Sequence, residues 1–330
     1  MVWTNLHAKI HRTIKSRQLF GHNQRLLVAV SGGQDSLCLI KLLLDLQLKW
    51  RWNLGIAHCD HRWRSDSEAN ANHVKNLAQS WDVSFYLETA NEPLNSEAAA
   101  RNWRYQALSA IAQANNYQYI VTGHTQSDRA ETLLYNLMRG TGADGLQALT
   151  WQRPLTKEIM LVRPLLEITR TQTEQFCQEL NLPVWEDSTN QDLKYARNRI
   201  REELIPYLRE SFNPNVESAL AQTAELLQAE VEYLEKATQQ LREEAMGENI
   251  NTVDNHYLRL NRRVLQKAPL ALQRRVMRQV LQEILVDAPN FEHIEKLTAL
   301  IVAPNRSQTD PFPGGAIAQV QDDWICLRSG

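Results

Sequence analysis

Short apolar runs alternate with longer segments of helical periodicity from Arg25 to about Ile205. A continuous apolar run of a few residues is typical of a strand buried on both faces, whereas apolar positions three or four apart predict a helix. We therefore expect strands at 26–30, 52–58, 83–87, 119–123 and 159–162. We expect the intervening helices at 37–48, 67–81, 97–112, 133–138 and 171–180. This alternation predicts an α/β fold with a doubly wound parallel sheet.

The hydrophobic pattern changes after Pro214. Apolar residues recur at helical spacing over 216–244, and strand signals disappear until the tail, where 316–320 and 324–327 predict a terminal hairpin. The second part of the chain is therefore expected to be smaller and mainly helical. We expect two domains, spanning residues 1–212 and 213–330.

The overall charge of the chain excludes one kind of nucleic-acid binding. A net charge of −2 gives no basic surface over the whole molecule, so contact with a polyanion needs a local patch. One candidate patch is the segment 255–282, which contains no acidic residue and carries seven cations: Arg259, Arg262, Arg263, Lys267, Arg274, Arg275 and Arg278. On one helical stretch these would bind a phosphate backbone, or else form an exposed cationic face.

The cysteines and the chain start bear on location. Four cysteines occur without a CxxC pair, which argues against a zinc knuckle and a disulfide framework and favours a reducing cytoplasm. No apolar run reaches membrane-spanning length, so we expect no membrane contact. The first 34 residues are basic and lack acids, as in a transit peptide, but Leu6, Ile10 and Ile14 recur at fourfold spacing. This spacing favours a first helix that covers a sheet edge.

The first apolar run stops at a glycine pair and continues as a helix. Such a strand-to-helix turn leaves unpaired N–H groups facing one point with the positive helix end behind them, which is typical of a phosphate site. Asp35 beside bound phosphates indicates Mg²⁺ between them, because a carboxylate alone would repel the phosphates. The alternative is a glycine turn without chemistry. The residues expected to bind phosphate are Ser31, Gly32, Gly33, Gln34, Asp35 and Ser36.

A second cluster follows the fourth expected strand. Gly123 and His124 lead into a helix on which Asp128 and Glu131 are three residues apart and therefore share one face. Two carboxylates placed in this way can bind a metal ion or a cationic amine. The alternative is an acidic first turn that complements the helix dipole.

Further polar residues lie where parallel strands end or where helices present arginines. His58 and Asp60 follow the second expected strand, at the edge where open parallel sheets bind ligands. Arg197 and Arg201 are four residues apart and would present bidentate donors to phosphate or RNA together, or else form a solvated helix face. Arg101 and Arg104 are three residues apart on the helix expected over 97–112.

Taken in order, these motifs resemble one family. The hexapeptide SGGQDS resembles the PP-loop of the N-type ATP pyrophosphatases, and it lacks the lysine of a Walker loop. Together with HCDHRWR, EAAARNWRY, GHTQSDRAET, RGTGADGL, RPLL, EDSTN and RNRIR, it resembles the tRNA(Ile)-lysidine synthetases over 25–206. The helical continuation and the hairpin resemble the short form of that family, with one C-terminal domain.

The resemblance implies a two-step ligation. The C2 oxygen of the wobble cytidine in the CAU-anticodon tRNA(Ile) attacks the α-phosphate of ATP and releases pyrophosphate. The ε-amine of free lysine then displaces AMP and gives lysidine, which changes codon reading from AUG to AUA. The implied partners are tRNA(Ile), ATP, Mg²⁺ and L-lysine, and a homodimer is allowed.

The resemblance also implies residue roles. Asp35, Asp128, Glu131, Arg197 and Arg201 would be catalytic, with Asp35 and Asp128 holding Mg²⁺ and Asp128 and Glu131 orienting lysine. The nucleotide would contact the PP-loop and a set of flanking residues: His58, Asp60, Arg101, Arg104, Gly123 and His124. Thr125 stands where many relatives have a second histidine, and Cys59 stands where they have valine.

Two alternatives remain open. A PP-loop thiolase shares adenylation but needs a persulfide cysteine or iron–sulfur ligands, which the absence of a CxxC pair disfavours. A non-catalytic nucleotide- or RNA-binding adaptor would retain the fold without the reaction.

Overall fold

The computed structural model describes residues 3–62, 66–92, 96–185, 192–246 and 257–328. It separates into two compact units, residues 1–228 and 229–330, and α10 (Val216–Met246) belongs partly to each. The expected boundary between 212 and 213 therefore remains a prediction. The EDSTN motif lies outside the described residues.

A six-stranded sheet forms the centre of the first unit, with the order β3-β2-β1-β4-β6-β5. Five strands are parallel and confirm the expected α/β fold: β1 (Arg25–Ala29), β2 (Asn53–Asp60), β3 (Ser84–Thr89), β4 (Tyr119–Thr122) and β6 (Met160–Val162). The edge strand β5 (Gln152–Pro154) is antiparallel and was not predicted, because three residues ending in proline carry no strand pattern. The strand order reverses between β1 and β4, which makes this pair the topological switch point.

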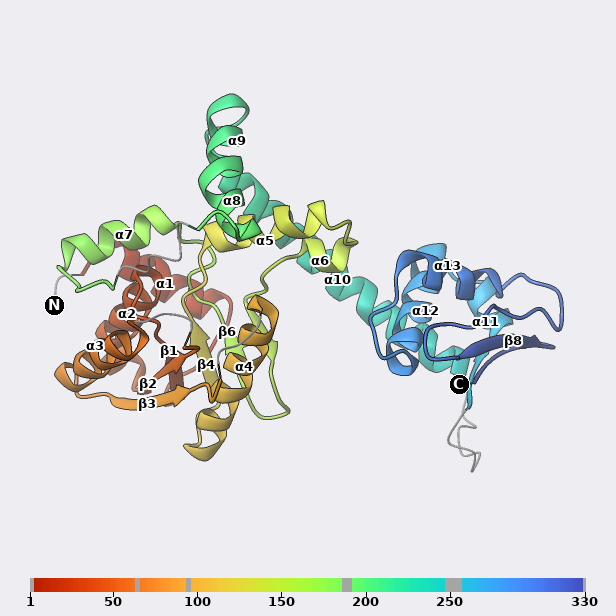
Figure 1. Ribbon diagram of the computed structural model, residues 1–330, viewed down its shortest axis with the longest axis horizontal. Coiled ribbons are helices and arrows are strands. Elements are labelled where there is room, and N and C mark those ends of the chain that lie inside the picture. Colours follow the sequence, from red (N-terminus) through yellow and green to blue (C-terminus); the bar gives the residue numbers. More distant parts are fainter. Residues whose placement is uncertain (1–2, 63–65, 93–95, 186–191, 247–256, 329–330) are drawn as a thin grey trace. The chain divides into compact units, whose positions relative to one another are not determined.

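Helices cover both faces of this sheet (Figure 1). Side chains of β1 alternate between the two layers: Leu26 and Val28 pack with the helices on one face, and Leu27 packs with Leu108 of α4 on the other. The helices that alternate with these strands or directly follow them are α1 (Asn5–Ser16), α2 (Gln34–Trp50), α3 (Ser67–Ser80), α4 (Glu97–Ala114), α5 (Gln126–Met138), α6 (Ala143–Leu146) and α7 (Arg170–Glu179). Ile10 and Ile14 of α1 are fully buried, as the fourfold spacing predicted.

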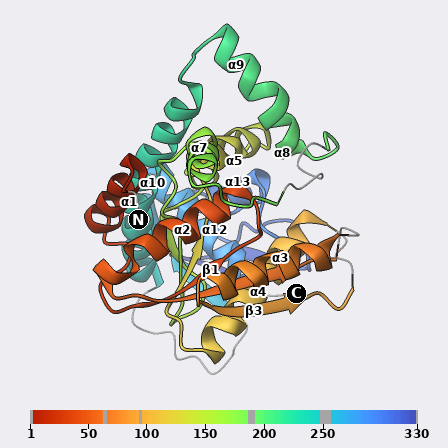
Figure 2. The same cartoon turned by 90° about the vertical axis from the view of Figure 1, so that its left-hand side faces the viewer.

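Beyond the sheet, a helical rod leads into α10. Figure 2 shows α8 (Ala196–Arg199), a π-helical segment (Ile200–Leu204) and α9 (Ile205–Ser211) as one continuous rod. Pro206 lacks the N–H that would continue the regular hydrogen-bond pattern, which accounts for a change of helix type at this point. Ile200 and Ile205 pack with Leu134 of α5, so the rod is attached to the helix that carries the second motif.

The second unit holds a three-stranded antiparallel sheet with the order β7-β9-β8. The expected hairpin is confirmed as β8 (Ile317–Gln321) and β9 (Trp324–Arg328). The expectation that strand signals are absent after Pro214 was wrong at β7 (Tyr257–Asn261), which pairs with β9. This five-residue strand lies within the basic stretch and is followed directly by a helix at Arg262, so its short alternation of apolar and polar residues was not recognised. Three helices complete the unit: α11 (Arg262–Gln266), α12 (Leu270–Ile284) and α13 (Phe291–Ala299).

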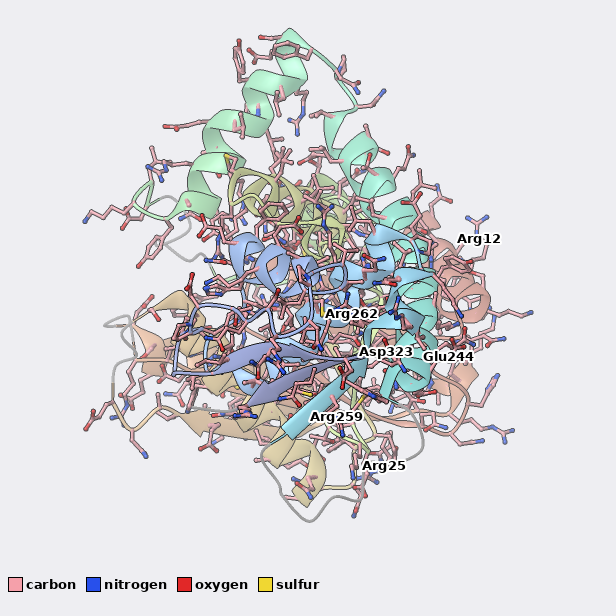
Figure 3. All side chains as sticks on the ribbon, turned by 90° about the vertical axis from the view of Figure 1, so that its right-hand side faces the viewer. Arg12, Arg25, Glu244, Arg259, Arg262 and Asp323 are labelled. Carbon is pink, nitrogen blue, oxygen red and sulfur yellow. The ribbon has the colours of Figure 1, made fainter. Side chains whose placement is uncertain are left out.

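The seven cations of 255–282 do not form one helical cationic face. Six of them lie in β7, α11 and α12, Lys267 follows α11, and acids from distant parts of the unit pair with several of them. Glu235 pairs with Arg275 and with Arg278 at 3.1 Å, and Arg274 lies 2.6 Å from Glu295. Figure 3 shows Arg259, Arg262 and Asp323 of this unit, and Asp323 pairs with Arg263 at 2.8 Å. Counting charges along one segment missed partners that only folding supplies.

One carboxylate links three elements of the first unit. Glu225 of α10 accepts hydrogen bonds from Arg129 at 2.6 Å, Trp151 at 2.8 Å and Arg17 at 2.7 Å. Arg129 is only 2% exposed, so loss of its partner would leave a buried charge without compensation. Burial would raise the pKa of Glu225, but the hydrogen bonds from Arg129, Trp151 and Arg17 lower it.

We expect Glu225→Ala to lower the free energy of unfolding of the first unit by about 3 kcal/mol, measured by urea titration near neutral pH. The exposed Glu230→Ala on the same helix is the control and should change it by less than about 0.5 kcal/mol. Because the pKa of Glu225 is lowered on folding, its contribution is full above the ordinary pKa of 4.5 and is lost as the pH falls below it. Equal stability of the two variants would contradict this account.

Candidate functional site

The SGGQDS turn connects β1 to α2 in a fixed loop. Gly32 adopts a φ of +91°, and a Cβ there would lie 2.6 Å from the Asn70 side-chain oxygen, so only glycine suits the position. Neighbouring elements hold the loop carbonyls: the Asn70 amide donates to Ser31 O at 3.0 Å, and Trp185 N–H donates to Gly32 O at 3.0 Å. The first-turn N–H groups of α2 have no acceptor within the helix, which leaves them available to an anion.

The second motif contacts this loop at Gly123, where the absence of a side chain allows a close approach. Gly123 follows β4, and a Cβ there would lie 2.8 Å from the Asp35 carbonyl oxygen and 3.1 Å from Ser36 N. These contacts are to backbone atoms, which cannot move aside without displacing the start of α2. Glycine at this position therefore allows the ends of β1 and β4 to bring both motifs together at the switch point.

Three carboxylates from the two motifs converge on one arginine that the sequence analysis did not select. Arg170 Nε lies 3.3 Å from Asp35 Oδ2, and its two terminal nitrogens lie 3.3 Å from Asp128 Oδ1 and 3.6 Å from Glu131 Oε1. The expected meeting of Asp35, Asp128 and Glu131 is thus present in the structure. Arg170 follows the RPLL motif at the start of α7, and its position alone carried no recognisable sequence signal.

The two carboxylate oxygens of Asp128 have different partners. It is the third residue of α5, and its Oδ2 accepts from Thr125 N at 2.7 Å and from Thr125 Oγ1 at 2.8 Å in a capping box. Its Oδ1 faces Arg170 instead. One oxygen therefore fixes the start of the helix, and the other is directed into the cluster.

Glu131 is held by a bidentate arginine. Arg201 Nε and Nη2 donate to its two oxygens at 2.7 Å and 2.8 Å, and Glu131 is 3% exposed. Arg197, expected to act together with Arg201, instead lies over the ring of Tyr135 at 5.9 Å. Because Glu131 and Tyr135 are one turn apart on α5, both arginines face that helix but contact different residues.

The carboxylates differ in their protonation behaviour. Burial raises the pKa of Asp35 and of Glu131, and the neighbouring Asp128 adds to both shifts. Burial also acts against ionisation of Asp128, but Arg170, His124 and the hydrogen bonds from Thr125 together outweigh it and lower the pKa of that carboxyl. Arg170 makes the largest of these contributions and therefore favours the ionised form of Asp128 in this crowded acidic cluster.

Arginines gather around one tyrosine of α4. The guanidinium groups of Arg101, Arg104 and Arg153 lie 5.3, 5.9 and 5.0 Å from the ring centre of Tyr105. Arg163 of the RPLL motif is 1% exposed, and burial lowers its pKa. Burial works against ionisation of Tyr105, yet the nearby arginines lower its pKa. Among the described residues none of these four guanidinium groups forms an ion pair, so this arginine cluster retains its positive charge.

The histidines and Asp60 occupy the same sheet edge in supporting positions. His58 Nδ1 lies 2.8 Å from Val30 O, and burial lowers its pKa. Asp60 accepts from Arg62 N–H at 2.8 Å and from Ser67 Oγ at 3.2 Å, which fixes the turn after β2. Burial, together with the charge of Arg163, lowers the pKa of His124 to about 3 against the opposing charge of Asp128. The pKa of His124 therefore depends both on the arginine cluster and on Asp128.

The carboxylates fit a magnesium ion only together with a phosphate ligand. Within the described ranges, no group of three or more acidic, histidine or cysteine side chains is arranged to hold a metal. Asp35 Oδ2 and Asp128 Oδ1 both face Arg170 and are hard oxygen ligands. Mg²⁺ commonly takes one or two carboxylates and completes its shell with phosphates and water.

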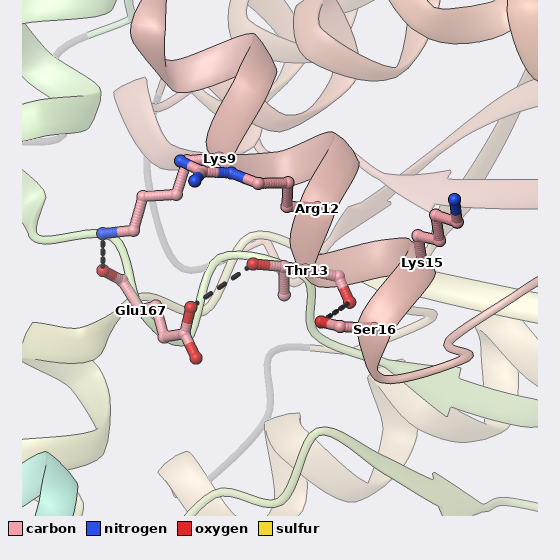
Figure 4. Close-up of a pocket in the computed structure, with 6 residues that line it drawn as sticks. All are labelled: Lys9, Arg12, Thr13, Lys15, Ser16 and Glu167. Carbon is pink, nitrogen blue, oxygen red and sulfur yellow. Dashed lines mark hydrogen bonds between the residues drawn. The ribbon is translucent and has the colours of Figure 1, made fainter.

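A separate groove beside α1 is basic. It is lined by six residues, Lys9, Arg12, Thr13, Lys15, Ser16 and Glu167 (Figure 4). Lys9 Nζ donates to Glu167 O at 2.7 Å, and burial lowers the pKa of that lysine. None of the sequence-predicted site residues lines this groove.

The fold and the loop define a PP-loop protein, and comparisons with known proteins agree. The PP-loop domain family matches residues 3–208, and the TilS substrate binding domain matches residues 260–324. A tRNA(Ile)-lysidine synthase of a Nostoc species is 80% identical and covers 100% of this chain and 98% of its own length. One from Synechocystis is 52% identical and covers 98% of each chain. The chain belongs to the tRNA(Ile)-lysidine synthase family.

A solved structure supports the fold alone. The U34-tRNA thiolase NcsA from Methanococcus maripaludis aligns with a TM-score of 0.57 over 67% of this chain and 77% of its own, at 15% identity.

No helix in the described parts of the chain is both long and apolar enough to cross a membrane.

We expect Gly123→Ala to weaken ATP binding by about tenfold or more, because the new methyl group would push against the Asp35 backbone. Gly142→Ala is the matched control, since nothing lies within 4 Å of the Cβ it would carry. Calorimetric titration with ATP compares the two variants, with circular dichroism as a check on folding. Unchanged affinity in Gly123→Ala would show that the close approach does not shape the site.

Proposed function

We propose that this chain ligates lysine to the wobble cytidine of a CAU-anticodon tRNA(Ile), using ATP. The proposal is supported by relatives of that name over the full chain and by one structural observation. That observation is the meeting of a phosphate-binding turn with three carboxylates at the switch point of the sheet. A nucleotide phosphate and a cationic amine would then be bound next to each other.

In the first step, the triphosphate binds at the turn that includes Ser31 to Ser36. The first-turn N–H groups of α2 and the hydroxyl of Ser36 would hold phosphate oxygens, and the dipole of this 17-residue helix adds positive potential. The cytidine oxygen attacks the α-phosphate, a bond forms between them, and pyrophosphate leaves. Asp35 and Asp128 would hold Mg²⁺, which neutralises phosphate charge when bound.

In the second step, the lysine ε-amine attacks C2 and AMP leaves. Asp128 and Glu131 would bind this amine, because both direct carboxylate oxygens to the same point. Arg201 positions Glu131 through its two hydrogen bonds. The protein supplies orientation and charge, and no covalent enzyme intermediate is needed.

The arginine cluster is proposed to contact tRNA or nucleotide phosphates. Arg101 and Arg104 lie one helical turn apart on α4, as the sequence predicted, and Arg153 and Arg163 join them from the sheet. A cluster of guanidinium groups that has no carboxylate partner among the described residues is suited to phosphate oxygens. The pKa of His124 is influenced both by this cluster and by Asp128. We propose that His124 lines the nucleotide site.

The structure disfavours the thiolase alternative. All four cysteines are free, and burial raises the pKa of Cys38, that of Cys59 to about 12 and that of Cys177 to about 12. A persulfide-forming cysteine needs a reactive thiolate, which these environments oppose. Cytoplasmic location and homodimer assembly remain predictions from the sequence.

The direct test supplies the chain with CAU-anticodon tRNA, ATP, Mg²⁺ and labelled lysine. We expect AMP and pyrophosphate to be released and the label to appear in one tRNA nucleoside, detected by mass analysis. A parallel reaction replaces lysine with a sulfur donor. If the lysine label does not enter the tRNA, and a heavier nucleoside appears only in the reaction with the sulfur donor, the chain would be identified as a thiolase instead.

We expect Asp35→Asn and Asp128→Asn each to reduce tRNA-dependent pyrophosphate release by about a hundredfold or more, since each removes a carboxylate proposed to hold Mg²⁺ at the reacting phosphates. The exposed Glu158→Gln is the charge-matched control and should retain activity. Thermal unfolding confirms that each variant is folded. A non-catalytic adaptor predicts that the Asp35 and Asp128 variants behave like the control in cells and in the assay.

A further inference from the structure

Arg170 occupies the point at which the carboxylates meet, and the proposed reaction gives it no role. Its contacts to Asp35, Asp128 and Glu131 measure 3.3, 3.3 and 3.6 Å, which are long for charged hydrogen bonds. Arg201, by contrast, binds Glu131 at 2.7 and 2.8 Å in a bidentate pair. Arg170 therefore shares its charge among three acids without a short bond to any of them, whereas Arg201 is firmly held.

The backbone of Arg170 is anchored while its side chain is not. Its N–H donates to Ser127 Oγ at 3.2 Å, and its carbonyl accepts from the Gln34 side chain at 3.0 Å and from Thr173 Oγ1 at 2.8 Å. The side chain is 29% exposed, so the protein does not enclose it completely. Rotation about side-chain bonds can therefore move the charge without disturbing α7.

The guanidinium and an incoming cation would compete for the same carboxylate oxygens. Asp128 Oδ1 and Glu131 Oε1, which face Arg170, are the atoms proposed above to bind the lysine amine. Two positive charges a few ångströms apart in a partly buried site repel each other strongly. Among the described residues, the ion pairs at this point involve the three acids, Arg170 and Arg201.

We propose that Arg170 is a displaceable counter-ion that occupies the amine position of the substrate-free protein and moves out when lysine binds. This inference rests on the proposed function. The resting protein thereby avoids leaving Asp35 and Asp128 without a close cation, at the cost of weaker lysine binding.

A fixed role for Arg170 predicts the opposite effect of substitution. If the guanidinium stayed in place with lysine bound, it would hold the carboxylates in position, and its removal would weaken lysine binding. A displaceable counter-ion competes with lysine, and its removal strengthens binding. The sign of the change in the lysine KM therefore separates the two.

We expect Arg170→Met to lower the lysine KM in the complete tRNA reaction by about tenfold, since the competing charge is gone. Arg170→Lys is the matched control: it keeps a cation at the cluster and should leave the KM within about twofold of wild type. A KM that is unchanged or raised in Arg170→Met would overturn the proposal. Wild-type lysidine formation in the same assay tests the proposed function separately.

A second measurement keeps the inference testable if Arg170→Met is inactive or poorly folded. In Arg170→Ala, binding of labelled lysine to the free protein is measured with and without millimolar guanidinium. Added guanidinium should weaken lysine binding to this variant and leave the wild type unaffected, because only the variant has space for it. Equal sensitivity of the two proteins, or none in either, would contradict a shared cation position.

Discussion

Buried carboxylates beside a phosphate-binding turn need a positive charge between them, and the architecture of the first unit follows from that constraint. Asp35, Asp128 and Glu131 would repel one another and any nearby phosphate without a cation. In the structure Arg170 supplies that cation and favours the ionised form of Asp128. In the proposed reaction the lysine amine and Mg²⁺ would take its place, so the same acids serve both stability and chemistry.

The sheet brings these groups together through backbone contacts. Strand order reverses between β1 and β4, so the elements that follow these strands lie next to each other. The absent side chain of Gly123 lets the turn after β4 touch the start of α2. Arg201 then fixes Glu131 from the rod that follows α7, and Arg170 closes the cluster from α7 itself. Residues far apart in the sequence thus form one compact charged site.

Local sequence patterns predicted much of this arrangement. The parallel strands, the phosphate-binding turn and the shared face of Asp128 and Glu131 follow from periodicity and spacing, which are local properties. Arg170 could not be found in that way, because its partners lie 135 and 42 residues distant in the chain. The strand β7 and the neutralised cations of α12 were missed for the same reason: pairing partners are set by tertiary structure. Local patterns identify helices and strands, whereas contacts between these elements determine which charged side chains are neutralised.

The most direct test of the account is a crystal structure of the chain with a non-hydrolysable ATP analogue, Mg²⁺ and lysine. The account predicts the triphosphate at the turn after β1 and the lysine Nζ within about 3 Å of Asp128 and Glu131 oxygens. It also predicts that the Arg170 guanidinium has left the three acids. Lysine bound elsewhere, with Arg170 still between Asp35, Asp128 and Glu131, would contradict it.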